Sequence, residues 1–187
     1  QEEFIQLYES KQAAAEFTGS GRLLTDAALA NLHLGLRAGT LTAEGQTHLR
    51  LAHDQLVKGL SRSPANAYAW ARLAQIRLAT GHPAEAVMEA LRMSLQVAPH
   101  ETRLALPRVR LGFVVHPWWD DRMRQDIERQ IESLTVAQMP AVAALALSFG
   151  ETGFVEANLG DQSGPRVLAY RQALERLVSD RANGRAK

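Results

Sequence analysis

One apolar stripe constrains the fold of this chain more than any other feature. Met123, Ile127, Ile131 and Leu134 recur at helical spacing among charged residues, so they fall on a single face of an α-helix. The same periodicity runs through almost all of the 187 residues and is broken only by short stretches of Gly, Pro, Thr and Asp. A helix with one apolar face must pack against another element, so the chain is predicted to be a packed array of helices.

Composition supports the same fold class. Aromatic residues make up only 6% of the chain and β-branched residues are few, which disfavours sheet. We therefore expect an all-α protein of about nine helices. The predicted helices cover approximately residues 2–17, 26–38, 42–62, 66–80, 83–97, 101–115, 121–134, 140–149 and 166–178.

Particular residues are predicted to begin, end or bend these helices. Thr25 is predicted to cap the start of the second helix, and Gly39 to end it. Pro107 lies inside the sixth predicted helix and should kink it. The glycine-rich stretch 150–165 is the only long loop that we expect, and loops of that length are usually mobile or functional.

Charge and cysteine content exclude several function classes. The formal net charge of +1 is too small to indicate a nucleic-acid partner or a charged membrane surface. The absence of cysteine excludes thiolate catalysis, disulfides and cysteine-based zinc sites. No apolar run is long enough to span a membrane. Because the chain begins with Gln1 rather than Met, it is compatible with a preceding signal peptide or anchor helix.

A repeat with a period of about 35 residues is present. It follows the tetratricopeptide (TPR) pattern, in which Trp and Leu of one helix pack on small residues of the next and a proline ends the pair. Arg77 departs from the pattern, because an aromatic residue is usual there. The matching residues are Ala52, Leu56 and Pro64, followed by Trp70, Leu73, Ala74, Gly81, Ala86 and Pro99. The helices predicted over 101–134 form a third, degenerate unit.

The segment 63–113, with the tryptophan-containing turn after it, resembles the TPR-like proteins encoded beside bacterial exopolysaccharide biosynthesis machinery. The resemblance, which spans about residues 60–150, implies a TPR-like array of helical hairpins. Chain length and helical pattern predict a single domain over residues 1–179, with its best repeat signal at 34–134, and a disordered tail at 180–187. The resemblance also implies an accessory or assembly role. Proteins of this kind typically carry an N-terminal membrane segment, which favours an envelope location through a segment absent from this chain.

The stretch VVHPWWDDRM (114–123) is the chemically richest in the chain. His116, Asp120 and Asp121 offer donors for metal binding or acid–base chemistry, but adjacent aspartates at a helix start project in different directions. Helix capping by Asp120, with Asp121 in the first turn, is the interpretation we favour. Trp118 and Trp119 either fill a groove between hairpins or stack on a partner or sugar ring, and we expect one to be buried and the other at least partly exposed.

In a TPR array, the first helices of successive hairpins line a concave face. Two arginines seven residues apart on that face favour an acidic peptide, a carboxylate or an anionic glycan. The alternative is that they are solvated and paired with Glu101 or aspartates. The repeat places Tyr68, Ala71, Gln75, Arg103 and Arg110 on this face, with Arg108 beside it.

The sequence contains no phosphate-binding, hydrolase, zinc-protease or dinucleotide motif, so we expect neither an enzyme nor a cofactor or metal. The predicted function is a non-catalytic scaffold that binds a protein partner, such as a membrane-bound polysaccharide synthase or export component. Its binding residues would be Tyr68, Gln75, Arg103, Arg110, Trp118 and Trp119. The alternatives are a glycan-binding module that uses the tryptophans and arginines, and an enzyme built around His116 and the two aspartates.

Overall fold

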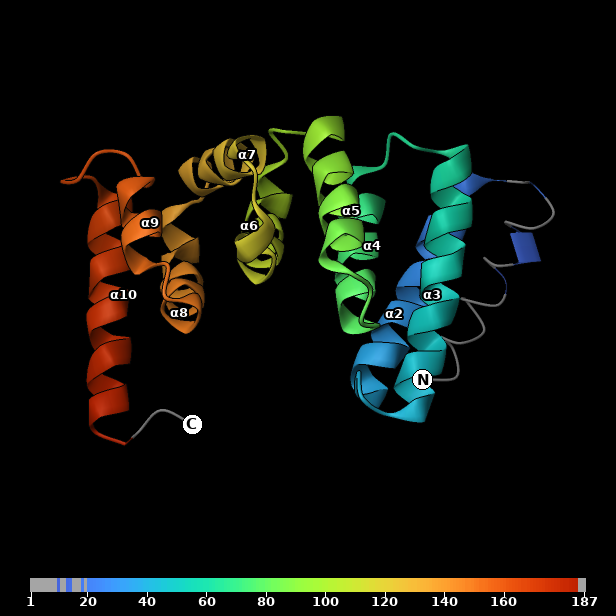
Figure 1. The fold of residues 1–187 in the computed structure, drawn as a ribbon, viewed down its shortest axis with the longest axis horizontal. Coiled ribbons are helices and arrows are strands. Elements are labelled where there is room, and N and C mark those ends of the chain that lie inside the picture. Colours follow the sequence, from blue (N-terminus) through green and yellow to red (C-terminus); the bar gives the residue numbers. More distant parts are fainter. Residues whose placement is uncertain (1–9, 11–12, 15–17, 19, 185–187) are drawn as a thin grey trace. The chain divides into compact units, whose positions relative to one another are not determined.

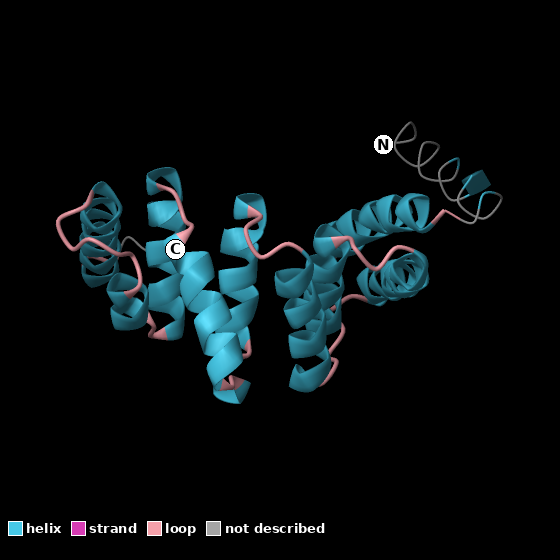
Figure 2. Cartoon of the chain, turned by 90° about the horizontal axis from the view of Figure 1, so that it is seen from above, coloured by secondary structure: helices cyan, strands magenta, loops and turns pink. Residues whose placement is uncertain are grey.

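The computed structural model of this chain describes residues 10, 13–14, 18 and 20–184, and within them every regular element is helical. This confirms the predicted all-α class (Figure 2). The chain divides into two compact units, one up to Pro99 and one from His100 onward, and each is described by itself. The helix predicted over 2–17 lies almost entirely outside the described residues.

Residues 20–99 of the first unit form two helical hairpins, α2 with α3 and α4 with α5 (Figure 1). Helix α3 also packs against α4. Gly59 allows close approach between α2 and α3, because a Cβ there would lie 2.7 Å from Thr25 Cγ2. The bounds are Gly21–Ala38 for α2, Ala43–Arg62 for α3, Ala67–Ala79 for α4 and Ala84–Val97 for α5.

Helix α2 begins earlier than predicted. Ser20, not Thr25, is the N-cap, and its side chain accepts from the backbone N–H of Leu23. Thr25 is buried inside the helix and donates its hydroxyl to the Arg22 carbonyl at 2.8 Å. The predicted end is confirmed, since Gly39 follows the helix with a φ of 97°, a conformation that glycine adopts at little cost.

The second unit contains five α-helices and three short 3₁₀ turns among residues 100–184. Helix α6 packs against α7, and α8 packs against both α6 and α10. The α-helices are α6 Ala105–Val114, α7 Asp121–Glu132, α8 Met139–Phe149, α9 Thr152–Ala157 and α10 Pro165–Ala182, and the turns are η1 Thr102–Leu104, η2 His116–Trp118 and η3 Val136–Gln138.

The core of the second unit contains the predicted apolar stripe. Met123, Ile127 and Ile131 of α7, and Leu134 just after it, are all buried. Pro107 does not kink a helix interior, because a 3₁₀ turn precedes it and Pro107 is the third residue of α6. A proline in the first turn interrupts no hydrogen bond within the helix.

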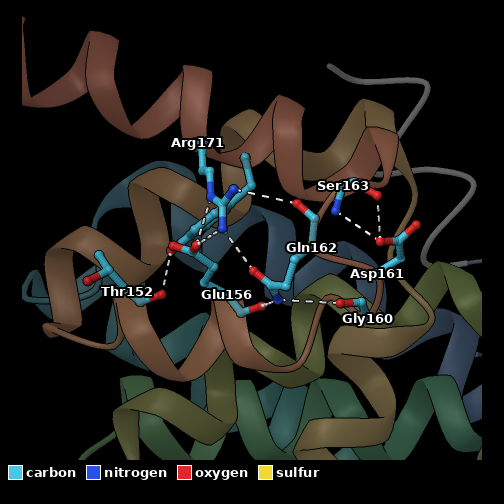
Figure 3. A network of polar contacts seen from close by, with 8 residues as sticks. Thr152, Glu156, Gly160, Asp161, Gln162, Ser163 and Arg171 are labelled. Atoms are coloured by element: carbon cyan, nitrogen blue, oxygen red, sulfur yellow. Dashed lines mark hydrogen bonds and ion pairs between the residues drawn. The ribbon is translucent and has the colours of Figure 1, made fainter.

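The predicted long loop at 150–165 is largely ordered structure. Its first half forms α9, and Arg171 of α10 fixes the rest (Figure 3). Arg171 Nε donates to Glu156 Oε1 at 2.7 Å and its Nη2 donates to Gln162 Oε1 at 2.8 Å. The predicted tail also begins too early, since α10 continues to Ala182.

No single helix in the described part of the chain is both long and apolar enough to cross a membrane. Helix α7 and the segment Val136–Phe149 pass that test only as a pair, and they meet at a bend of 108°.

Candidate functional site

The two adjacent tryptophans between α6 and α7 have opposite environments. Trp119 is half-buried, donates its indole Nε1–H to the Gly112 carbonyl at 3.0 Å, and packs near the rings of Phe113 and Phe154. Trp118 is 52% exposed. The expectation of one exposed ring is met by Trp118, whereas Trp119 packs on neighbouring rings but is half-buried and not buried as predicted.

His116 is held by a residue that the sequence analysis missed. Its Nδ1 lies 2.5 Å from Oε1 of Glu151, which directly precedes α9, and its ring meets the Trp119 ring edge-on at 4.5 Å between centroids. The two partners of this contact are 35 residues apart. No local pattern indicates such a pairing, because it depends on how α8 and α9 return to the turn.

The two aspartates of the turn lie at the start of α7 and stabilise it. Asp120 is the N-cap of α7 and accepts from the Met123 N–H at 2.8 Å, while Asp121 is exposed in the first turn. Within the described residues, no group of three or more His, Asp or Glu side chains is placed to hold a metal ion. The geometry thus supports the capping interpretation, and His116 pairs with Glu151.

Arg103 and Arg110 are both exposed, but they do not share one continuous α-helix, because Arg103 lies in η1 and Arg110 in α6. Neither guanidinium takes part in an ion pair with the described residues. The carboxylate of Glu101 instead accepts from the backbone N–H of Arg103 at 3.2 Å. Both arginines are accessible to a ligand.

Arg108 was predicted beside the binding face, and that placement is wrong. Its side chain is fully buried and donates to Oε1 of Gln130, also buried, at 3.1 Å. Arg108 therefore belongs to the interior between α6 and α7, where polar groups must be paired.

The remaining predicted residues lie in the first unit, on α4. Gln75 is exposed and Tyr68 is half-buried, whereas Ala71 is buried and cannot contribute a surface. Trp70 is half-buried and donates to the Pro64 carbonyl at 2.8 Å. The six predicted binding residues are thus divided between the two units, four of them in the second.

Tyr68 lines a pocket of about 390 Å³ in the first unit. The pocket also contains Arg22 and Asp26, which lie one turn apart on α2. Arg72, one turn beyond Tyr68, has a pKa below its ordinary value because burial disfavours its charge, while Asp26 and Tyr68 act in the opposite direction. The complete lining is Arg22, Asp26, Ser63, Ala65, Asn66, Ala67, Tyr68, Val97 and Ala98.

Comparison with known proteins gives no match to any family model, curated protein or solved structure. The function must therefore be argued from the geometry of these residues and from the sequence patterns.

Proposed function

We propose that this chain is a non-catalytic scaffold that binds a partner protein, with Trp118 as the anchor of the contact. The single observation that carries the proposal is that Trp118 is 52% exposed on a turn whose neighbouring side chains are fixed. Tryptophan is among the residues most enriched in the energetically dominant contacts of protein interfaces, so an exposed tryptophan on an ordered turn is a candidate for such a contact.

The turn around Trp118 is fixed on both sides. Before it, His116 pairs with Glu151. After it, Trp119 is tied to Gly112 and Asp120 caps α7. An anchor on a pre-organised turn loses less conformational freedom on binding than one on a flexible loop, so more of its contact energy appears as affinity.

Positive charge lies in the same unit. Arg103 and Arg110 are exposed and have no ion-pair partner among the described residues. Arginine binds carboxylates with a two-pronged geometry, so we expect the partner segment to be acidic as well as apolar. On the first unit, we propose Tyr68 and Gln75 as a separate contact for the partner, and Gln75 is exposed for it.

We propose a TPR-like arrangement and a role in bacterial exopolysaccharide synthesis or export. The arrangement is supported by successive helix pairs and by the burial of the repeat residues Ala52, Leu56, Leu73 and Ala74. The pathway, an envelope location and a membrane-bound synthase or export component as partner follow from the sequence resemblance. No catalytic step, cofactor, metal or nucleic acid enters this proposal.

The test is co-purification with proteins encoded beside the gene. The tagged chain, its Trp118→Ala variant and its Leu41→Ala variant are co-expressed with each neighbouring polysaccharide component. Leu41 is 97% exposed in the turn between α2 and α3 and controls for loss of exposed apolar surface. We expect Trp118→Ala to reduce the affinity of capture by at least about tenfold, as for a dominant contact, and Leu41→Ala to leave it unchanged. Equal capture by both variants would overturn the proposal.

A glycan-binding function is the second candidate, and the exposure of Trp118 favours it too, because an accessible indole can stack on a sugar ring. Exposed Arg110 would then contact acidic sugars. Electrophoresis through a gel containing an acidic polysaccharide separates the two functions. Retardation that disappears in Trp118→Ala supports glycan binding, whereas no retardation together with partner capture supports the scaffold.

A further inference from the structure

We infer that the pocket on the first unit binds an acidic side chain carried by an extended peptide segment. This inference rests on the proposed function, because the partner protein would supply the segment. It adds a second contact, on a different unit from Trp118, and it assigns a role to Arg22 and Asp26.

Three polar side chains of the pocket make no polar contact within the described fold. The side chains of Arg22, Asp26 and Tyr68 make no hydrogen bond or ion pair with any other residue that the structure describes. Asn66, in contrast, is occupied, because it caps α4 through the Ala69 N–H and donates to Thr25 Oγ1. A few convergent polar groups in a concave surface are the usual signature of a ligand site.

The charged groups of the pocket indicate which chemical groups a ligand must carry. The lining carries one charged group of each sign, the guanidinium of Arg22 and the carboxylate of Asp26. The guanidinium of Arg22 suits a carboxylate, which it can bind through two parallel hydrogen bonds. Asp26 accepts hydrogen bonds only, so the ligand must also present donors, as the N–H groups of a peptide backbone do.

The walls of the pocket favour a peptide over a sugar. Four of the lining residues are small and aliphatic: Ala65, Ala67, Val97 and Ala98. Tyr68 is the only aromatic residue in the lining. Small aliphatic walls cover the hydrocarbon part of a Glu or Asp side chain, whereas sugar sites usually offer a broad aromatic face.

The test is an NMR titration of the full chain with two capped peptides, Ac-Ala-Ala-Glu-Ala-Ala-NH₂ and its Glu-to-Gln counterpart. We expect the Glu peptide to produce saturable shifts in the amide signals of Ala67, Tyr68 and Val97. The Gln peptide should bind at least about fivefold more weakly, since a charge-assisted contact is lost. Arg22→Gln should weaken binding of the Glu peptide equally. Arg37→Gln, in the last turn of α2, is the matched control and should have no effect.

Equal binding of the two peptides, no saturable shift, or unchanged binding by Arg22→Gln would overturn the inference. Galacturonic acid is titrated in parallel, and binding of it in preference to the Glu peptide would also overturn it. Trp118→Ala distinguishes this inference from the scaffold proposal, because Trp118 lies in the other unit. If partner capture depends on Trp118 but the Glu peptide does not bind, the inference about the pocket is wrong and the scaffold proposal stands. If the Glu peptide binds but partner capture does not depend on Trp118, the inference about the pocket is supported and the proposal that Trp118 anchors the partner is wrong.

Discussion

Trp119 donates its indole N–H to the carbonyl oxygen of Gly112 across 3.0 Å. This bond links the turn after α6 back to the helix itself. The carbonyl lies near the C-terminal end of α6 and also accepts from the backbone N–H of Val115 at 3.0 Å. The bond and the surrounding aromatic rings explain why Trp119 packs inward while its neighbour Trp118 faces solvent.

The two tryptophans should therefore differ in their effect on stability. Trp119→Phe should lower the free energy of unfolding by about 1–2 kcal/mol, because the Gly112 carbonyl keeps only the Val115 N–H as donor and the smaller ring leaves space. Trp118→Ala should change it by less than about 0.5 kcal/mol, as an exposed residue does. Urea denaturation followed by circular dichroism measures both. A larger loss in Trp118→Ala would mean that this ring stabilises the fold.

Substitution by alanine should have opposite effects on stability at Gly112 and at Gly153. A Cβ on Gly112 would lie 2.6 Å from Cδ1 of the buried Ile127, whereas one on Gly153 in α9 would meet nothing within 4 Å. Gly112→Ala should destabilise the protein by about 1–3 kcal/mol through overpacking.

Gly153→Ala should stabilise the protein by about 0.5–1 kcal/mol, because alanine loses less backbone entropy in a helix. Melting temperatures measured by calorimetry should move in opposite directions for the two variants. Shifts of the same sign would contradict the packing described around α6.

Local patterns predicted much of the secondary structure, because caps and stripes depend on residues close in sequence. The stripe of α7 and the cap at Asp120 are examples. Helix α9 was missed because its glycine-rich surroundings suggest a loop. Its position depends on packing against α8 and on the contact of Arg171 with Glu156.

The candidate sites were harder to predict, because they assemble from distant segments. The partner of His116 is Glu151, and the burial of Arg108 depends on Gln130 of another helix. The pocket at Tyr68 combines four segments, at the start of α2, the end of α3, the start of α4 and the end of α5. Helical periodicity assigns a face to each residue but not the element that will cover it.

The aspartates at the start of α7 provide a third prediction. Asp120→Ala should cost at least about 1 kcal/mol, because the Met123 N–H loses its capping acceptor. Asp120→Asn should retain most of this stability, since asparagine caps almost as well. Asp121→Ala, which removes only a favourable charge near the helix dipole, should cost no more than about 0.5 kcal/mol. Chemical denaturation ranks the three variants, and a costlier Asp121→Ala would contradict the assignment of the cap.

The fourth prediction concerns alkaline pH. Tyr170 is fully buried, and its hydroxyl donates to the Thr152 carbonyl at 3.0 Å. Burial, and secondarily the charge of Glu156, raises the pKa of Tyr170 to about 12, above the value of about 10 expected for an unfolded chain.

A raised pKa of an acid means that the folded state favours the neutral phenol. The stability contributed by that preference is fully present below about pH 10 and is lost as the pH rises toward 12. The loss should reach about 2 kcal/mol in order of magnitude.

In Tyr170→Phe, the free energy of unfolding should be lower at neutral pH, because the bond to Thr152 is gone, and should fall less between pH 10 and 12. Urea denaturation of both proteins across that range measures the difference, and parallel curves would show that the phenol of Tyr170 ionises as easily in the folded protein as in the unfolded chain.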